Sequence, residues 1–309
     1  LYLYVFLIVI FDFLGQLVMW IPAKQFLNRP IFNLESIKKN LRPTILLFLP
    51  QVAISLYVVL DRTLLGILGS YSDVGIYEQG QKLISILLTV VNSLGAVMLP
   101  RVANLLSERR DKEAQNMVKF SFILYNLIIF PMIFGFIAIN EVFVKLFLGQ
   151  NFQDVKYVLY IIVFNIMLVG WTNILGFQVL VVRNKNKEYM LSTTIPAFVS
   201  VAVNIAVIPF FGYIGASITC VIVEILVFAI QWYYSRNIIN KNLLFNKDLV
   251  KIICSSLVMF GAVILCKMTL GLDGIIGLII YLAVGGISYL GMLFLLKTVN
   301  IREMKRMLK

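Results

Sequence analysis

Residues 274–296 read GIIGLIIYLAVGGISYLGMLFLL, an apolar run without a single charged side chain. A hydrocarbon core about 30 Å thick is crossed by roughly 20 mostly apolar helical residues, so this run is long enough to span a bilayer. Eight further runs have the same character. The nine predicted membrane-spanning helices are Leu1–Ile21, Thr44–Leu68, Ile76–Val102, Met117–Ala138, Val155–Val182, Met190–Phe210, Ala216–Tyr234, Leu249–Leu265 and Gly274–Leu296.

The composition of the 309-residue chain agrees with a membrane protein. Hydrophobic residues make up 61% of it and charged residues 14%, and the mean hydropathy is +0.93. Soluble domains usually carry about 25% charged residues. Because the apolar runs are continuous rather than alternating, helices can pair the backbone groups within each run, and a β-barrel is not predicted. The predicted fold class is all-α, a polytopic membrane helical bundle with nine transmembrane helices.

Basic residues follow a pattern along the chain, whose formal net charge is +12. All but five of the 27 lysine and arginine residues lie in or at the edges of alternate connections, with the C-terminal tail included. Because positive residues accumulate in cytoplasmic loops, we expect the first residue outside and the C-terminus in the cytoplasm. Such loop charges face anionic lipid headgroups, and binding to nucleic acid is not predicted.

The sequence offers no set of residues for catalysis or for a cofactor. Histidine is absent, and no Walker A motif occurs. The three cysteines, Cys220, Cys254 and Cys266, have neither metal-ligand nor disulfide spacing. We therefore expect no enzymatic activity, no metal and no cofactor.

Ionisable side chains at membrane depth are the candidate functional residues. A charge near the bilayer centre costs about 2.5–3.5 kcal/mol on insertion scales, so it usually faces protein or water. Asp61 and Arg62 lie near the end of one predicted span. Glu78, Gln81 and Lys82 lie near the start of the next. Counting outward from the intervening turn places Asp61 opposite Lys82, and places Arg62 opposite Gln81.

We predict that Asp61, Arg62, Glu78 and Lys82 form a cluster between two antiparallel helices. Glu78 and Lys82 also share a helix face at i,i+4 spacing. The cluster can be a structural ion-pair network that fixes helix register. It can also line a cavity and bind an anionic substrate, with Arg62 as the strongest candidate because guanidinium binds phosphate through two hydrogen bonds. The sequence leaves both interpretations open.

Two more carboxylates lie in the middle of predicted spans, Asp12 in the first and Glu224 in the seventh. Either can carry a proton or a cation during transport, and either can instead be paired with a neighbouring helix. Four amides within spans are expected to hydrogen-bond between helices and so to have a structural role. They are Asn126, Asn165, Asn173 and Asn204.

Short motifs carry a resemblance to a known family. DRTLLG at 61–66 with VGIY at 74–77 is similar to the hairpin with which the second helical bundle of that family begins. MLPR at 98–101 is similar to the end of the next helix in that family. LFLG at 146–149 is similar to its outer LFG turn, and FGYIGA at 211–216 to a later turn. In this order and spacing, the motifs resemble those of the Wzx-type polysaccharide flippases of the multidrug/oligosaccharidyl-lipid/polysaccharide exporter superfamily.

The resemblance implies two helical bundles around a central cavity that opens alternately to each side. The chain begins at Leu1 within an apolar run, and we interpret it as a fragment that lacks the helices before it. In the linker, Asn33 is expected to cap a short helix. The implied parts are 1–21 as the last helix of the first bundle, 22–42 as a cytoplasmic linker, 43–238 as the six-helix second bundle, 249–296 as an additional transmembrane hairpin and 297–309 as a basic cytoplasmic tail.

The resemblance also implies a function, the translocation of undecaprenyl-diphosphate-linked oligosaccharide repeat units across the bacterial inner membrane for capsule, O-antigen or a related polysaccharide. Arg62 and Lys82 match the family's cavity cations, and Asp61 matches an acidic position beside them. Basic side chains would then meet the diphosphate and sugar acids. The implied partners are the lipid-linked oligosaccharide, anionic membrane lipids, and a polysaccharide polymerase with chain-length proteins.

Other functions remain open on the sequence alone. A lipid II flippase or a drug/cation antiporter would share the fold, and an antiporter should have a more acidic, less basic cavity. A membrane polysaccharide polymerase or ligase would need a large outer loop with catalytic Arg or His, and the connection at 140–154 is short and lacks both. A non-transporting scaffold should tolerate the loss of Arg62 and Lys82 together.

Overall fold

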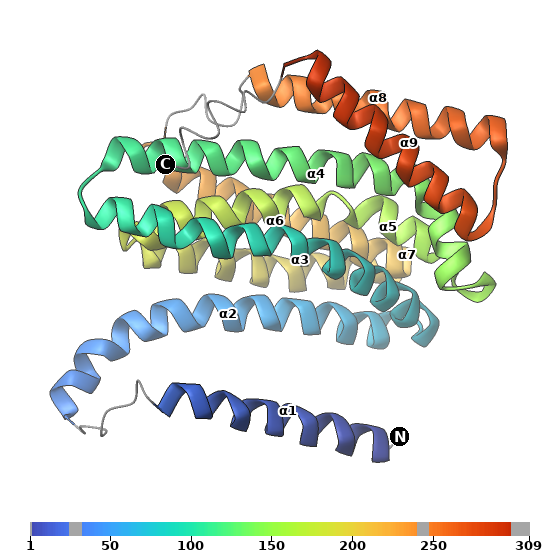
Figure 1. Ribbon diagram of the computed structural model, residues 1–309. Helices are drawn as coiled ribbons and strands as arrows, with labels where there is room; N and C mark the ends of the chain where they lie inside the picture. Colours follow the sequence, from blue (N-terminus) through green and yellow to red (C-terminus); the bar gives the residue numbers. More distant parts are fainter. Residues whose placement is uncertain (1, 25–32, 240–246, 298–309) are drawn as a thin grey trace. The chain divides into compact units, whose positions relative to one another are not determined.

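A computed structural model describes residues 2–24, 33–239 and 247–297, and in these ranges every regular element is a helix (Figure 1). The chain divides into two compact units, Leu1–Thr44 and Ile45–Lys309. The first unit contains α1 (Tyr2–Ala23) and the start of α2 (Leu34–Leu68). The second unit contains the rest of α2 and all later helices.

The second unit is a bundle of long helices. In Figure 1, α3, α4, α6 and α7 run side by side, and these helices pack against one another. The segment from Val155 to Arg183 is divided, and a π-helix interrupts it. The bounds are α3 (Tyr71–Ser107), α4 (Asp111–Phe147), η2 (Gln150–Phe152), α5 (Val155–Ile162), α6 (Asn165–Asn173), the π-helix η3 (Ile174–Leu180), η4 (Val181–Arg183), α7 (Asn186–Ser235), α8 (Lys247–Leu270) and α9 (Gly274–Leu295).

Seven helices of the described residues are long and apolar enough to cross a membrane, so the predicted count of nine is not confirmed. Two predicted spans, Met190–Phe210 and Ala216–Tyr234, fall within the 50-residue helix α7. The helical backbone of α7 is interrupted at Gly212, where φ is 51° and ψ is −131°. Glycine adopts this conformation readily because it has no Cβ. The predicted first span lies in α1, where the described apolar stretch Val9–Pro22 is shorter than a full span.

Side-chain caps fix where two helices begin. The Oγ of Ser70 accepts a hydrogen bond from the N–H of Asp73 at 3.1 Å, and the Asp73 carboxylate accepts one from the N–H of Ser70 at 3.0 Å. This reciprocal capping box starts α3. Asn33 accepts a hydrogen bond from the N–H of Glu35 at 3.0 Å, which confirms the predicted cap. The helix that follows is not short, because it continues as α2 to Leu68.

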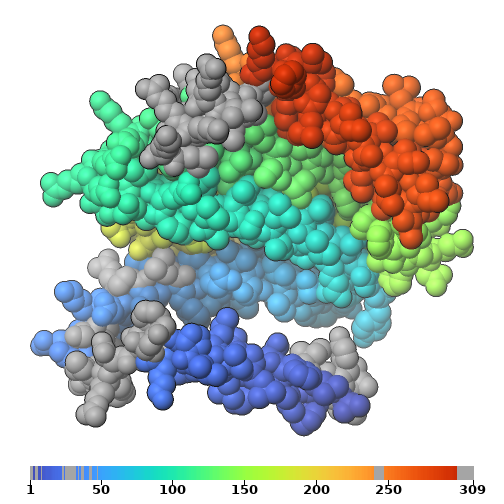
Figure 2. All heavy atoms as spheres, viewed as in Figure 1, coloured from blue at the N-terminus to red at the C-terminus, as the bar shows by residue number. Residues whose placement is uncertain are grey.

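The helices α8 and α9 form a hairpin that packs on α4, and Figure 2 shows their orange and red atoms above the green atoms of α4. Two ion pairs join this hairpin to α4. Lys267 lies 3.0 Å from Glu141, and Lys145 lies 2.8 Å from Asp273. The hydrogen bond from Lys145 lowers the pKa of Asp273. The hairpin is therefore fastened to α4 at the end where α8 turns into α9.

Gly80 allows α3 to approach α5 closely. A Cβ added at Gly80 would lie 2.5 Å from Cγ1 of Val158. We expect Gly80→Ala to destabilise the bundle by about 1–3 kcal/mol, because overpacking forces the neighbours to shift. Gly75→Ala on the same helix is the matched control, since a Cβ there would meet nothing within 4 Å. Thermal unfolding in detergent micelles measures both variants, and equal midpoints would contradict the close approach.

Candidate substrate cavity

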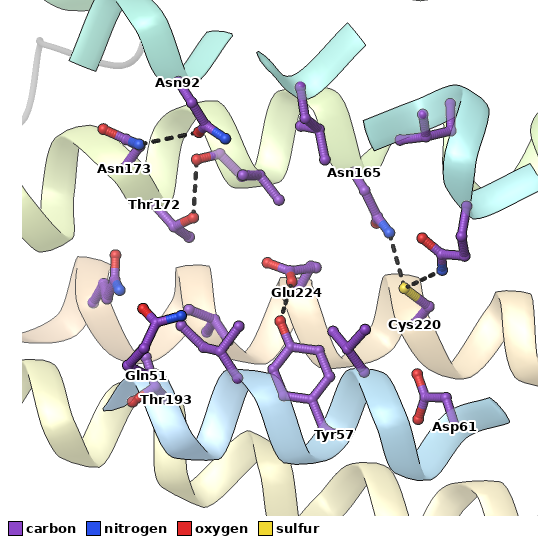
Figure 3. Close-up of a pocket in the computed structure, with 18 of the residues that line it drawn as sticks. Gln51, Tyr57, Asp61, Asn92, Asn165, Thr172, Asn173, Thr193, Cys220 and Glu224 are labelled. Carbon is purple, nitrogen blue, oxygen red and sulfur yellow. Dashed lines mark hydrogen bonds between the residues drawn. The ribbon is translucent and has the colours of Figure 1, made fainter. Parts of the chain in front are cut away.

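A cavity of about 320 Å³ lies in the second unit, lined by residues of α2, α3, α6, η3 and α7. Figure 3 shows the labelled side chains along its length, with Asp61, Cys220 and Asn165 at one end and Tyr57 and Glu224 in the middle. Gln51, Asn92, Asn173 and Thr193 lie at the other end. Polar groups at membrane depth therefore border a hollow, which is where buried charges are tolerated.

Asp61 of α2 is 2% exposed and is held by three donors. Its Oδ1 accepts hydrogen bonds from Oγ of Ser200 at 3.0 Å and from Nδ2 of Asn204 at 2.6 Å. Its Oδ2 accepts one from the Tyr77 hydroxyl at 3.4 Å. Ser200 and Asn204 are four residues apart on α7, so helical periodicity turns both towards Asp61. Among the described residues, Asp61 has neutral donors and no ion-paired cation.

Glu224 of α7 is the second carboxyl group of the cavity. It is buried, and its Oε1 accepts a hydrogen bond from the Tyr57 hydroxyl at 2.8 Å (Figure 3). Tyr57 and Asp61 are one helical turn apart on α2, so one face of α2 presents both to α7. No partner for Glu224 could be identified from the sequence, and in the structure the partner is Tyr57, 167 positions away in the chain.

A chain of weaker contacts extends from Asp61 along the cavity wall. The Nε2 of Gln81 donates to the Tyr77 hydroxyl at 2.7 Å and lies 3.4 Å from Sγ of Cys220. The Nδ2 of Asn165 donates to the same sulfur at 3.1 Å. Gln81, a predicted site residue, thus connects Asp61 to Cys220 through Tyr77, and it lines the cavity.

The predicted ion cluster forms with one member missing. The Nε of Arg62 lies 2.8 Å from Oε2 of Glu78, and Nζ of Lys82 lies 3.6 Å from Oε1 of Glu78. Asp61 is not part of it, because its donors are Tyr77 and residues of α7. Of the three ion-paired residues, Arg62 is the one that lines the cavity in the described part of the chain.

Helix geometry explains both errors in the predicted register. Neighbouring residues on an α-helix point about 100° apart, so Asp61 and Arg62 cannot both point towards Glu78 and Lys82. Arg62 turns to α3 and pairs with Glu78, about one turn from the predicted partner Gln81. The expected basic cavity is not found either. Arg62 is the one basic residue among the described lining residues, whereas Asp61 and Glu224 are acidic.

The other end of the cavity is lined by uncharged polar groups, and we call it the amide-lined end. The Nδ2 of Asn173 donates to Oδ1 of Asn92 at 3.3 Å, and the Tyr125 hydroxyl donates to Oδ1 of Asn173 at 3.4 Å. Gln231 is 1% exposed, and its Oε1 has no hydrogen-bond partner in the described structure. The members of this end are Gln51, Asn92, Thr172, Asn173, Thr193 and Gln231.

The interhelical role predicted for four amides is confirmed. Asn126 accepts a hydrogen bond from the Trp171 indole at 2.9 Å, Asn204 donates to Asp61, and Asn165 donates to Cys220. Asn173 bonds across helices to Asn92. Asn165 and Asn173 also line the cavity.

Sequence reasoning missed Tyr57, Ser200 and the amide-lined end apart from Asn173. A signal was present in the spacing of polar residues along apolar helices. Cys220, Glu224 and Gln231 recur at intervals of four and seven on α7, which is the period of one helix face. Asp12 lies on α1 in the first unit with its side chain exposed.

Membrane-length helices around a polar cavity, with carboxyl groups among its lining residues, are typical of membrane transport proteins. Comparison with known proteins makes the class more specific. The model of a family described as "Polysaccharide biosynthesis protein" matches residues 5–157. The chain is 24% identical over 211 residues to a putative O-antigen transporter of Escherichia coli K12. It is 21% identical over 253 residues to a probable low-salt glycan biosynthesis flippase, Agl15, of Haloferax volcanii.

These matches confirm the resemblance to the Wzx-type flippases, and the relatives are transporters rather than enzymes. The matched regions cover 68% and 82% of this chain, and the chain spans 51% and 53% of the two relatives. It therefore corresponds to about half of their length.

Two solved structures share the fold. The lipid II flippase MurJ in an inward closed conformation matches with a TM-score of 0.69 at 15% identity, over 90% of this chain and 59% of that one. An outward-facing multidrug resistance MATE family transporter matches with a TM-score of 0.57 at 16% identity, over 82% of this chain and 64% of that one. The described helices thus share the fold of these two solved structures.

Proposed function

We propose that this chain is part of a flippase that moves undecaprenyl-diphosphate-linked oligosaccharide repeat units across the bacterial inner membrane. The observation that carries the proposal is that Asp61, Arg62 and Glu224, three ionisable residues of membrane-length helices, line one cavity within the bundle. Such a hollow gives the polar head group a path through the bilayer. Substrate binding then shifts the equilibrium between the inward-facing and outward-facing states, because the two states bind the substrate with different affinities.

The lipid tail has a separate, apolar place to lie. A cavity of about 630 Å³ is lined almost wholly by apolar side chains of α3, α4, α8 and α9, including Leu87, Ile139 and Val263. An isoprenoid chain in this cavity loses no hydrogen bonds and keeps its contact with apolar surface. We infer that the hairpin of α8 and α9 guides the tail while the head group crosses.

Asp61 and Glu224 are the residues we assign to ion coupling. Both are buried carboxyl groups, both line the cavity, and both are held by neutral donors. A proton or a small cation that binds them neutralises charge that is otherwise costly at this depth. Asp12 stays a second candidate for this role.

The remaining parts of the proposal follow the sequence. Residues 43–238 are proposed as the second helical bundle, and 249–296 as an additional hairpin. The basic connections face the cytoplasm and its anionic lipids. A polymerase and chain-length proteins would receive the transported repeat unit.

A drug/cation antiporter is the second candidate, because the cavity is more acidic and less basic than predicted. Proteoliposomes separate the two functions. A flippase moves a fluorescent undecaprenyl-diphosphate oligosaccharide between leaflets, whereas an antiporter expels a cationic dye against a proton or sodium gradient. Dye efflux without movement of the lipid-linked sugar would overturn the flippase proposal.

Arg62→Ala is expected to abolish surface polysaccharide while the protein still inserts into the membrane. The reason is that Arg62 is the cavity's basic group among the described lining residues and can bind the diphosphate. Polysaccharide immunoblots and membrane-fraction immunoblots measure the two effects.

Glu78→Ala is the matched control for Arg62→Ala. It breaks the same ion pair, whose side chains are 37% and 25% exposed, and such partly exposed pairs contribute only about 0–1 kcal/mol. We expect Glu78→Ala to keep most of the polysaccharide. An equal loss in both variants would reduce Arg62 to a structural partner of Glu78.

A further inference from the structure

We propose that the amide-lined end of the cavity is a recognition subsite for uncharged sugar residues of the transported glycan. This inference rests on the proposed function, because it names the class of sugar that the same cavity accepts. The subsite is separated from Asp61 along the cavity, with Tyr57 and Glu224 between them (Figure 3).

The polar groups at this end match sugar hydroxyl and acetamido groups. Gln51, Asn92, Thr193 and Gln231 come from three different helices and are all uncharged. Asn92 is exposed, its Oδ1 accepts the hydrogen bond from Asn173, and its Nδ2 donates to no residue in the described structure. The unpaired Oε1 of Gln231 is a buried acceptor at the same end. A buried acceptor without a partner is costly, and a sugar hydroxyl can satisfy it.

An aromatic surface completes the subsite. The rings of Phe177 and Tyr189 have their centroids 5.2 Å apart, and both line the cavity. Phe177 lies in the π-helix η3, together with Gly176. A Cβ added at Gly176 would lie 2.9 Å from Tyr189 and 3.1 Å from Nε2 of Gln231. The Phe177 ring and the close backbone approach at Gly176 thus lie beside the Gln231 amide of α7, next to a π-helix, an element that is frequent at functional sites.

The charges of the cavity favour an uncharged sugar over an acidic one. A sugar carboxylate would add a third acidic group to a cavity that already holds Asp61 and Glu224, with no further cation in the described part of the lining to balance it. Arg62 is the one cation among the described lining residues. It is adjacent to Asp61 in the sequence and is already paired with Glu78, and it is not a member of the amide-lined end. A uronic acid at the amide-lined end would meet amides and hydroxyls alone. Neutral or acetamido sugars pair with those groups without leaving a charge unpaired.

The test uses the whole protein in nanodiscs, with two soluble probes of equal length. We expect triacetylchitotriose, which is uncharged, to raise the unfolding temperature, and trigalacturonate, which is acidic, to leave it unchanged. Gln231→Leu should weaken chitotriose binding about fivefold, the usual effect of losing one neutral hydrogen bond. Gln153→Leu, in an exposed connection, is the matched control. Equal binding of the two probes, or binding of neither, would overturn the proposal.

A gain-of-binding variant keeps the test independent of folding defects. Asn92→Lys places a cation at the amide-lined end, and we expect it to bind trigalacturonate while the wild type does not. Failure of this variant to gain binding, with the protein folded, also counts against the subsite. Proteoliposomes distinguish this inference from the function on which it rests. Movement of lipid-linked acidic and neutral glycans at equal rates would leave the flippase proposal intact and remove the subsite.

Discussion

Replacing Asp61 with Asn is expected to reduce transport strongly and to leave the bundle folded. Asn keeps an oxygen that can accept from Ser200 and Asn204, so the hydrogen bonds at 3.0 and 2.6 Å have a substitute acceptor. The negative charge is lost, and with it the ability to bind a coupling cation or proton. We expect transport to fall about ten- to a hundredfold, the range of a typical coupling free energy. Flipping rates in proteoliposomes, with and without an ion gradient, measure the effect.

Two further variants define what the Asp61 result means. Asp61→Leu also removes the acceptor, so each donor left unpaired costs about 1–3 kcal/mol and the protein should be less stable as well as inactive. Asp154→Asn removes a carboxylate of the same type from an exposed connection and should leave transport unchanged. Wild-type rates and gradient dependence in Asp61→Asn would remove Asp61 from the coupling mechanism.

Glu224→Gln is the second variant expected to have a large effect. Gln retains an oxygen for the Tyr57 hydroxyl, which lies 2.8 Å from the carboxylate, so the contact between α2 and α7 should persist. Loss of the carboxyl charge should again cost about ten- to a hundredfold in gradient-driven transport. The measurement is the ratio of flipping rates with and without the gradient. A ratio equal to that of the wild type would show that Glu224 has only a structural role.

Tyr57→Phe tests the same contact from its other partner. Phe keeps the ring but leaves Glu224 without its donor, so we expect an effect of about fivefold, as for one lost hydrogen bond. A loss as large as that in Glu224→Gln would mean that the hydrogen bond, rather than the charge, is what transport needs.

The structure changes how the cavity's charges are understood. Sequence counting gave a single four-residue ion cluster that served either structure or substrate. The molecule instead divides these residues between two faces of α2. Arg62 joins Glu78 and Lys82 on the α3 side, while Asp61 joins Ser200 and Asn204 on the α7 side. The ion pair and the ion-coupling candidate are therefore separate, and substitutions can test them separately.

Local features of the sequence were sufficient to predict a membrane protein made of helices and some of its contacts. Apolar runs of span length predict membrane helices because lipid requires each backbone group to be paired within its own segment. The Glu78–Lys82 pair and the Asn33 cap were predicted because they depend on residues two to four positions apart on one helix. The break at Gly212 inside α7 lies in the FGYIGA motif, for which the sequence predicts a turn. The predicted number of separate helices was not confirmed.

Only the tertiary structure decided which polar residues share the cavity. Asn204 meets Asp61 across 143 positions, and Glu224 meets Tyr57 across 167. Such pairs depend on the rotation of each helix about its axis, which is set by packing at positions such as Gly80 against Val158. An apolar helix in lipid can hide its polar face in any of several rotations, so periodicity identifies the face but not its partner. The amide-lined end arises in the same way, because α2, α3, α6 and α7 must meet beside the π-helix before its groups lie together.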